Sequence, residues 1–329
     1  MARNISHSLL TDAKTNKKDE FYTQLSDIER ELKHYKNHFK DKVVLCNCDD
    51  PRVSNFFHFF SYNFERFGLK KLIATCYKSK DADLFSENKS EQAIYLEYTG
   101  DKNGNNVPDA EEIGIKPLKG DGDFRSKECI ELLKEADIVV TNPPFSLFRE
   151  YVAQLIEYDK KFLIVGNINA ITYKEIFKLI KENKAWLGVN MGRGISGFIV
   201  PKHYELYGSE ARVDEDGNRI VATNNCLWLT NLDNPKRHDD IVLYKNYSAE
   251  EYPTYDNYDA INVDKTKDIP MDYSGAMGVP ITFLDKFNPD QFEILGQMAT
   301  TKIDEFNFGY PYVNGSKIYA RIVIKNKKK

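Results

Sequence analysis

The sequence predicts an α/β fold with a doubly wound, mostly parallel sheet that is covered by helices on both faces. Short apolar runs rich in β-branched residues alternate with amphipathic stretches. These runs are typical of strands buried on both faces, as in parallel sheets. The chain has 329 residues, which is enough for one large domain or for two domains with their own cores.

Five strands and five helices are expected in the first part of the chain. The strands are expected at residues 42–47, 71–77, 136–141, 161–167 and 185–190. The helices are expected at residues 25–39, 52–67, 126–135, 146–158 and 172–183. Asp50 and Pro51 precede the second helix and resemble a capping residue followed by a proline in the first turn.

Two regions depart from this alternation. Residues 78–114 are polar and rich in turn formers, and we interpret them as an insertion, partly a hairpin around the segment AIYLEYT. Residues 245–280 are dense in Tyr, Asn, Asp and Pro and follow neither period, and their tyrosines favour ordered contacts over disorder. Further strands or packed elements are expected at residues 197–201, 224–232, 280–296 and 319–326.

The composition is that of an ordinary soluble protein, with 41% hydrophobic and 29% charged residues. No apolar run reaches the roughly 18–20 residues of a spanning helix, and the N-terminus lacks a signal-peptide core, so a cytoplasmic location and no membrane are expected. A net charge of −4 argues against general coating of nucleic acid but allows a local basic groove. The five cysteines form no CxxC pair and no histidine has a metal-ligand spacing, so no metal site is expected.

The strongest candidate site is the stretch from Thr141 to Phe145, which directly follows the apolar run ADIVV. Pro143 and Pro144 have a fixed φ and offer carbonyls without N–H donors. The residue before a proline is extended. Asn142 and the neighbouring carbonyls therefore form a rigid arc of acceptors, and Phe145 adds a flat apolar face. Ligands of open α/β sheets bind at this end of the strands.

An exocyclic aromatic amine fits this arc. Its nitrogen is a poor nucleophile because its lone pair is delocalised into the ring. Acceptors from the Asn142 side chain and the Pro143 carbonyl would take its two hydrogens and favour a pyramidal nitrogen, whose lone pair can attack a methyl sulfonium. Catalysis would then rest on positioning and preorganised acceptors, without a metal. The alternative is that the stretch only ends a strand with a turn.

Asn-Pro-Pro-Phe resembles the catalytic motif of amino-methyltransferases, which use S-adenosylmethionine. Seven stretches together closely resemble the EcoRI modification methyltransferase family, from near residue 1 to about residue 295. They are DEFYTQ, NCDDPRVSNFF, GDGDFRS, DIVVTNPPFSLF, GVNMGRGISGFIVP, NNCLWLTNL and MGVPITFL. The resemblance implies the fold of class I S-adenosylmethionine-dependent methyltransferases, with a seven-stranded sheet, an insertion and a C-terminal recognition region.

The resemblance also implies residues that bind the methyl donor. They are Phe21, Tyr22 and Thr23 in the N-terminal motif, Asn47 and Asp49 after the first strand, and Asp123 and Phe124 in GDGDFRS. Asp123 would accept from the adenine amine of the donor, and Phe124 would pack on its ring. The loop after the first strand departs from the family pattern because it carries no glycine. The alternatives are that residues 21–23 only begin a helix and that GDGD is only a turn.

For catalysis, the resemblance implies Asn142, Pro143, Pro144 and Phe145. The target base would stack on Phe145, with Phe198 as a second aromatic wall. The alternative for Phe198 is an ordinary core residue on a strand. Flipping the base out of a duplex costs about a few kcal/mol, and stacking would offset roughly 1–3 kcal/mol of that.

The implied activity is site-specific methylation of adenine N6 in double-stranded DNA, with GAATTC as the implied target, in a restriction-modification or solitary role. Residues 1–234 would form the catalytic domain and residues 235–329 the DNA-recognition region. The expected protein is a monomer, and a cognate endonuclease would act on the same site without direct contact. The alternatives are an RNA adenine or protein glutamine methyltransferase and a catalytically dead nucleic-acid-binding protein.

Overall fold

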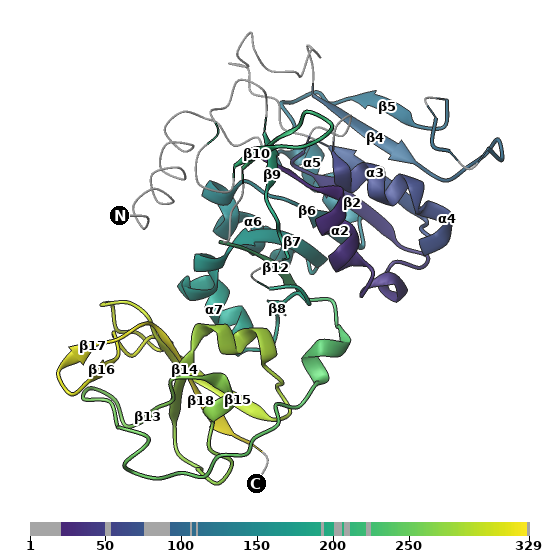
Figure 1. The fold of residues 1–329 in the computed structure, drawn as a ribbon. Coiled ribbons are helices and arrows are strands. Elements are labelled where there is room, and N and C mark those ends of the chain that lie inside the picture. Colours follow the sequence, from purple (N-terminus) through teal and green to yellow (C-terminus); the bar gives the residue numbers. More distant parts are fainter. Residues whose placement is uncertain are drawn as a thin grey trace. The chain divides into compact units, whose positions relative to one another are not determined.

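The computed structural model consists of two compact units (Figure 1). It describes residues 21–49, 54–75, 93–105, 107–109, 111–191, 194–200, 206, 211–221 and 225–327. The first unit comprises residues 1–168 and 190–232, and the second comprises residues 169–189 and 233–329. Residues 169–189, which we expected within the catalytic domain, thus cluster with the C-terminal part of the chain.

Most of the strands of the first unit belong to one large mixed sheet. Its strand order is β5-β4-β3-β2-β6-β7-β12-β8. The strands are β2 (Val43–Asn47), β3 (Lys71–Thr75), β4 (Ile94–Tyr98), β5 (Gly114–Pro117), β6 (Ile138–Thr141), β7 (Lys161–Asn167), β8 (Trp186–Leu187) and β12 (Cys226–Thr230). The four central strands, β3-β2-β6-β7, are parallel to one another. By contrast, β4, β5 and β12 pair antiparallel.

The expected seven-stranded, mostly parallel sheet is therefore corrected to eight strands of mixed direction. The reason lies in the connections, because a parallel neighbour needs a crossover that is usually helical. Helices α5 (Lys127–Glu135) and α6 (Phe148–Glu157) precede β6 and β7. The described residues between β4 and β5 contain no helix, so these strands form the hairpin expected around AIYLEYT.

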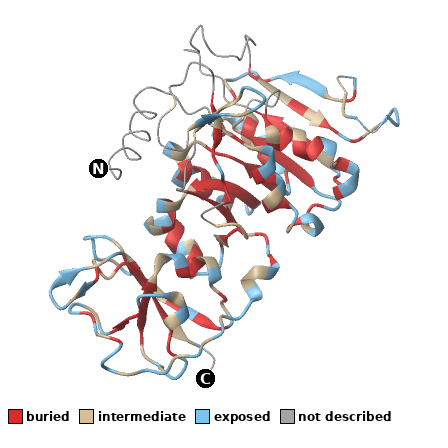
Figure 2. Ribbon diagram, in the orientation of Figure 1, coloured by how far each residue is buried: buried red, intermediate tan, exposed pale blue. Residues whose placement is uncertain are grey.

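The central strands of the large sheet are buried (Figure 2), whereas the edge strand β5 is exposed. Every residue of β2 and β6 is buried, as predicted for strands covered on both faces. Helix α3 (Asn55–Tyr62) adds a run of buried phenylalanines to this core. The helix expected at residues 52–67 is two helices, α3 and α4 (Phe64–Phe67), and residues 50–53 lie outside the described residues.

The helix expected at residues 25–39 is shorter than predicted. It comprises α2 (Leu25–Leu32), followed by the 3₁₀ turn η1 (Lys36–His38). Most of the remaining predicted elements are confirmed, although β8 is much shorter than the strand expected at residues 185–190. The other 3₁₀ turns are η2 (Phe145–Leu147), η3 (Ile168–Thr172), η4 (Pro235–His238), η5 (Thr266–Asp268) and η6 (Ile281–Lys286).

A small antiparallel sheet in the first unit joins distant parts of the sequence. Its order is β1 (Tyr22–Thr23), β9 (Phe198–Val200), β11 (Arg219–Val221) and β10 (Arg212–Val213). Thr23 pairs with Phe198 in the register of β1 and β9. This sheet therefore brings the N-terminal motif DEFYTQ next to the strand expected at residues 197–201.

The second unit contains helix α7 (Lys174–Lys181) and a sheet of order β13-β14-β18-β15. These strands are β13 (Ile261–Asn262), β14 (Met277–Pro280), β15 (Phe292–Met298) and β18 (Arg321–Asn326), and a separate hairpin joins β16 (Tyr312–Val313) to β17 (Ser316–Lys317). The tyrosine-rich segment is ordered as predicted: the Tyr255 hydroxyl donates to Asn262 Oδ1 over 2.8 Å. No helix among the described residues is long and apolar enough to cross a membrane.

Candidate active site

Asn142 lies directly after β6, and its side chain is held by one end only. The residue is 8% exposed. Its Nδ2 donates to the main-chain carbonyl of Phe21 over 2.6 Å. Its Oδ1 is buried and has no hydrogen-bond partner among the described residues. The contact with Phe21 thus fixes the carboxamide so that its acceptor end remains available.

The two prolines after Asn142 lead into a tight turn. The Pro144 carbonyl accepts from Leu147 N over 3.0 Å, which closes the turn at η2. Within the described residues, no donor reaches the Pro143 carbonyl. Pro143 is buried and Phe145 is half-buried. The arc therefore holds two acceptors, the Asn142 oxygen and the Pro143 carbonyl, with an aromatic ring on the same turn.

Three phenylalanines meet beside this turn. The Phe198 ring, only 1% exposed, lies 5.8 Å from the Phe21 ring and 6.1 Å from the Phe145 ring, both in edge-on contacts. Two rings that sandwich a flat base must be parallel and about 7 Å apart, which is twice a van der Waals contact. The Phe145 and Phe198 rings are inclined by 66°, so this arrangement must open before a base can enter.

Thr23 provides a second unpaired polar atom on β1. Its Oγ1 is buried without a hydrogen-bond partner among the described residues. Its carbonyl accepts from Asn55 Nδ2 over 2.8 Å, which attaches β1 to helix α3. An unpaired buried oxygen costs about 1–3 kcal/mol. The unpaired oxygens of Thr23 and Asn142 are therefore what a site built for a polar ligand would present, and both residues were predicted site residues.

The loop after β2 takes a backbone conformation that usually requires glycine. Cys48 has φ +87°, in the left-handed region that L side chains rarely adopt. Strain of this kind concentrates at ligand sites. The missing glycine noted in the sequence is thus replaced by a cysteine in the same type of conformation. Burial raises the pKa of the Cys48 thiol far above its usual value, so Cys48 is not a thiolate nucleophile.

The predicted donor-binding residues Asn47 and Asp49 differ in their surroundings. Asn47 is buried, its Oδ1 accepts from the Tyr151 hydroxyl, and its carbonyl accepts from Thr141 Oγ1. These contacts give Asn47 a role inside the protein, joining β2 to β6 and α6. Asp49 is half-buried and accepts from Ser54 Oγ over 3.4 Å.

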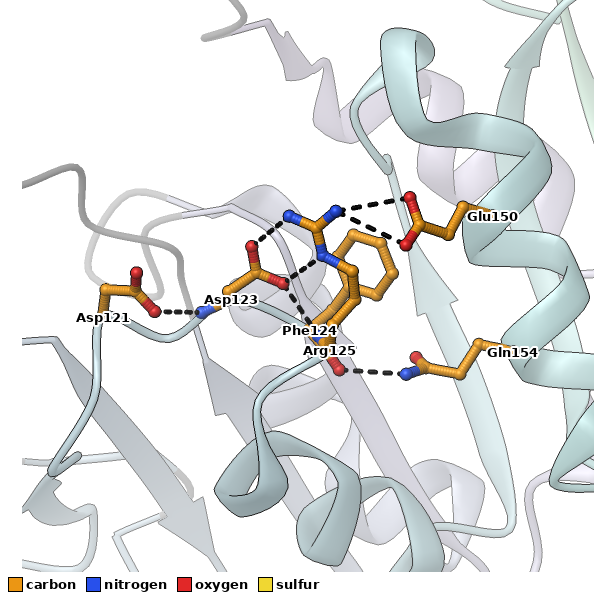
Figure 3. Close-up of polar contacts among 6 residues, drawn as sticks. All are labelled: Asp121, Asp123, Phe124, Arg125, Glu150 and Gln154. Atoms are coloured by element: carbon orange, nitrogen blue, oxygen red, sulfur yellow. Dashed lines mark hydrogen bonds and ion pairs between the residues drawn. The ribbon is translucent and has the colours of Figure 1, made fainter.

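Asp123 and its neighbours form a compact polar cluster (Figure 3). Arg125 binds the Asp123 carboxylate with two nitrogens, Nε over 2.8 Å and Nη2 over 2.6 Å, and also pairs with Glu150. These hydrogen bonds lower the pKa of Asp123, which keeps the carboxylate ionised. A carboxylate accepts up to about four hydrogen bonds, so Asp123 retains capacity for a ligand amine.

Phe124 packs beside the loop after β2. Its ring makes an edge-on contact with Tyr151, with the ring centroids 5.1 Å apart. Its carbonyl accepts from Gln154 Nε2 over 3.2 Å (Figure 3). Tyr151 thus contacts both Phe124 and Asn47, so these two predicted donor-binding residues are brought together around one α6 side chain.

Sequence reasoning missed the residues of α2 that hold the strand carrying Phe198. Asp27, fully buried, accepts from Ser196 N over 2.7 Å and from Ser196 Oγ over 3.0 Å. Glu31 accepts from Asn190 N over 2.9 Å. Both acids lie on the apolar face of an amphipathic helix, one turn apart. Two acidic residues on the apolar face of a predicted helix were the signal that could have identified Asp27 and Glu31.

The chain is similar to known proteins over nearly its whole length. The family model for the adenine-specific methyltransferase EcoRI matches residues 9–327. The chain is 60% identical to the Type II methyltransferase M.EcoRI of Escherichia coli, over 100% of this chain and 99% of that protein.

Two mycoplasma proteins are also similar. The chain is 40% identical to the Type II methyltransferase M.MgeORF184P of Mycoplasma genitalium, over 95% of this chain and 97% of that protein. It is 39% identical to the Type II methyltransferase M.MpnI of Mycoplasma pneumoniae, over 96% and 97% respectively. No solved structure matches the chain. The family match spans nearly the whole sequence, and the chain belongs to the adenine-specific EcoRI methyltransferase family.

Proposed function

We propose that this protein is a site-specific DNA methyltransferase that transfers a methyl group from S-adenosylmethionine to N6 of an adenine flipped out of double-stranded DNA. The observation that carries the proposal is the state of Asn142, whose donor end is held by Phe21 and whose acceptor end has no partner among the described residues. Membership of the adenine-specific family supports the choice of adenine. The identity with M.EcoRI makes GAATTC the first target to test.

Asn142 and Pro143 do the chemical work in this proposal. The Asn142 oxygen and the Pro143 carbonyl accept the two hydrogens of the adenine amine, so the nitrogen becomes pyramidal and directs its lone pair out of the ring plane. When bound, S-adenosylmethionine supplies the methyl group as a sulfonium. Preorganised acceptors of this kind need no rearrangement during the reaction. Pro144 closes the turn that fixes both acceptors, and Phe145 stacks on the base.

The donor site lies across the ends of β2 and β6. Asp123 would accept from the adenine amine of the donor, and Phe124 would pack against its ring. Asp49 and the strained backbone at Cys48 would contact the amino-acid portion. The hydroxyl of Thr23 and the residues Phe21 and Tyr22 would close the site from β1. Asn47 would support this loop through Tyr151.

The parallel core β3-β2-β6-β7 supports a doubly wound sheet of the class I S-adenosylmethionine-dependent type for the first unit. We assign DNA recognition to the C-terminal region, residues 235–329, where exposed tyrosines such as Tyr244 and Tyr247 offer stacking and hydrogen-bonding surfaces. The protein would act as a monomer, and a cognate endonuclease would meet the same DNA site without binding the methyltransferase.

A labelled-donor assay tests the proposal. The protein is incubated with S-adenosylmethionine carrying a labelled methyl group and with a GAATTC duplex, a duplex with a permuted site, RNA or bulk protein. We expect label in the GAATTC duplex and, after digestion, in N6-methyladenine. Label in RNA or in protein without label in DNA would overturn the proposal. Base-resolution mapping of DNA from an unmodified host that expresses the protein would then identify the target sequence directly.

A further inference from the structure

The loop between β4 and β5 has polar residues at regular intervals. Oxygen-bearing side chains occupy the first, third, fifth, ninth and twelfth positions of residues 101–112, namely Asp101, Asn103, Asn105, Asp109 and Glu112. The 12-residue calcium loop of EF-hands takes its ligands from these positions and from the main-chain carbonyl at the seventh, here Val107. The sixth position, usually glycine, is Asn106, which like Ala110 lies outside the described residues.

These side chains converge although the loop is largely exposed. Asp109 Oδ2 accepts from Asn103 Nδ2 over 2.6 Å and from Asn105 Nδ2 over 3.3 Å. Asp101 Oδ1 accepts from Gly104 N over 2.6 Å. Asn103, Asn105 and Asp109, at the third, fifth and ninth positions, therefore contact one another, and Asp101 at the first position closes the turn that follows it.

Glu112, at the twelfth position, is the observation that indicates a ligand. Its side chain is only 7% exposed although it is charged. One oxygen, Oε1, accepts from Lys102 N over 2.6 Å and from Asn103 N over 3.1 Å, which turns the carboxylate into the loop. The other, Oε2, is buried and has no partner among the described residues. A buried carboxylate oxygen is costly unless a cation or donor faces it.

The surroundings of the loop are negative. Burial raises the pKa of the neighbouring Tyr98 to about 12, and the charges of Glu112 and Asp101 add to the shift. Glu65 also reaches the loop, because its Oε1 accepts from Asp101 N over 3.3 Å. Excess negative charge at a converging set of oxygens favours a cation.

We propose that residues 101–112 bind one calcium ion through side-chain oxygens of Asp101, Asn103, Asn105, Asp109 and Glu112 and the carbonyl of Val107. Calcium accepts six to eight oxygen ligands in flexible geometry, whereas magnesium demands a near-ideal octahedron. Among the described residues, no three His, Cys, Asp or Glu side chains are grouped so that they could hold a metal ion, so Asp101, Asp109 and Glu112 must come closer together as calcium binds, with the amide and carbonyl oxygens completing the ligand set.

Binding requires local changes within the loop. The amide oxygens of Asn103 and Asn105 now accept from Asn105 N over 3.0 Å and from Val107 N over 2.8 Å, while their nitrogens donate to Asp109. A half-turn of each amide exchanges these contacts and brings its oxygen towards Asp109. Such terminal rotations lie between two near-equivalent orientations. The expectation of no metal site rested on the cysteines and histidines, and it does not extend to oxygen ligands. The proposal is independent of the proposed methyl transfer.

Calorimetric titration of the full chain with calcium, after removal of metals by a chelator, tests the proposal. We expect one site with a dissociation constant on the order of 10⁻⁵ to 10⁻³ M, since only three of the ligands are charged. Glu112→Gln should weaken binding at least about tenfold, because the twelfth ligand is bidentate. Glu111→Gln is the matched control, because Glu111 is the exposed neighbour outside the ligand pattern, and it should leave binding unchanged.

Terbium provides a second measurement. Tyrosine-sensitised terbium emission should appear with the native chain and be displaced by calcium, but not by an equal concentration of magnesium. Thermal unfolding of Glu112→Gln shows whether that variant remains folded. Absence of saturable calcium binding by the native chain, equal binding by Glu112→Gln, or equal displacement by magnesium would overturn the assignment.

Discussion

The side chain of Asn142 gains its directionality from a single hydrogen bond. A carboxamide has one acceptor end and one donor end of nearly the same shape. The carbonyl of Phe21 binds the donor end, so the oxygen is the end left for a ligand. The proposed role of Asn142 therefore depends on the amide nitrogen being hydrogen-bonded within the protein while the amide oxygen is not.

Replacing Asn142 tests that reading. Asn142→Ala removes the acceptor for the target amine, and we expect kcat to fall by about 10²–10³, as when one preorganised hydrogen-bonding group is lost. Binding of S-adenosylmethionine, measured by calorimetry, should change little because Asn142 faces the base. Asn142→Asp keeps an acceptor but loses the bond to Phe21, so its activity should lie between the two. Full turnover by Asn142→Ala would remove the residue from catalysis.

The Asp123–Arg125 pair predicts a pH-dependent contribution to stability. Hydrogen bonds from Arg125 lower the pKa of Asp123 below its ordinary 3.8. The contribution is therefore complete above that unfolded value and is lost as the pH falls through the lower folded value. Because Arg125 is largely exposed, it amounts to less than about 1 kcal/mol.

Urea unfolding across this pH range measures the effect. Arg125→Met should lower the free energy of unfolding at pH 6, and its difference from the native chain should shrink as the pH falls below 3.8. Lys127→Met, an exposed neighbour, is the control and should show no such convergence. A difference that is constant with pH would mean that Arg125 acts through packing alone.

At the scale of elements, α2 acts as a support for β9. The Asp27 carboxylate receives two hydrogen bonds from Ser196, and Gln24 Nε2 donates to the carbonyl of Gly197 over 2.9 Å. These contacts fix the residues immediately before Phe198. The helix and its capping residue thereby position the backbone that leads into Phe198.

Removing this support should cost stability. Asp27→Ala removes the buried carboxylate that accepts two hydrogen bonds from Ser196, so we expect the free energy of unfolding to fall by about 1–3 kcal/mol. Glu29→Ala, on the exposed side of the same helix, should change it by less than about 0.5 kcal/mol. Denaturant unfolding of both variants measures the difference. An equal loss in the two would show that helix propensity, and not the contact with Ser196, decides the effect.

The elements that the sequence predicted well are those whose signals are local. Buried runs such as residues 161–167 became β7 with the same bounds, and the capping serine Ser126 accepts from Cys129 N as α5 begins. The break in the helix at residues 52–67 was missed because the phenylalanines keep an apolar pattern through Asn63. The expected seven-stranded, mostly parallel sheet was also wrong, because the number and direction of strands depend on the connections and not on the strand residues.

For the candidate site, sequence reasoning predicted individual residues but not the contacts between them. Asn142 and Phe145 stand out because prolines fix the backbone between them. The pairing of β1 with β9, which brings Phe21 to Phe198, joins residues more than 170 positions apart and leaves no local signal. The hydrogen bond from the Tyr151 hydroxyl to Asn47 Oδ1 is equally non-local.

At the scale of the whole molecule, the compact units are not continuous in sequence. Residues 169–189 belong with residues 233–329, and α7 buries Ile176, Phe177 and Ile180 within that second unit. Two hydrogen bonds join the segment to β15, from Lys181 Nζ to the Ile294 carbonyl and from Gln297 Nε2 to the Thr172 carbonyl. A cut at the expected boundary near residue 234 would therefore separate α7 from its partners.

Truncation tests this organisation. A chain that ends at residue 232 should expose the apolar face of α7, and we expect it to aggregate or to give a poorly soluble product. Introducing Ile176→Lys and Ile180→Glu into the truncated chain should restore solubility, because it removes the exposed patch. Yield of soluble protein and sedimentation measure both. A soluble, cooperatively folding 1–232 chain would contradict the assignment of residues 169–189 to the second unit.

The bond from Asn142 to Phe21 uses a main-chain carbonyl, and this has an evolutionary consequence. Any amino acid at position 21 supplies the same oxygen, so point mutations there leave the polarity of the amide intact. The proposed catalytic residue thus keeps the orientation of its amide when the side chain at position 21 changes. The hydrogen bond would be lost only if the backbone itself moved, through an insertion, a deletion or a shift of register between β1 and β9.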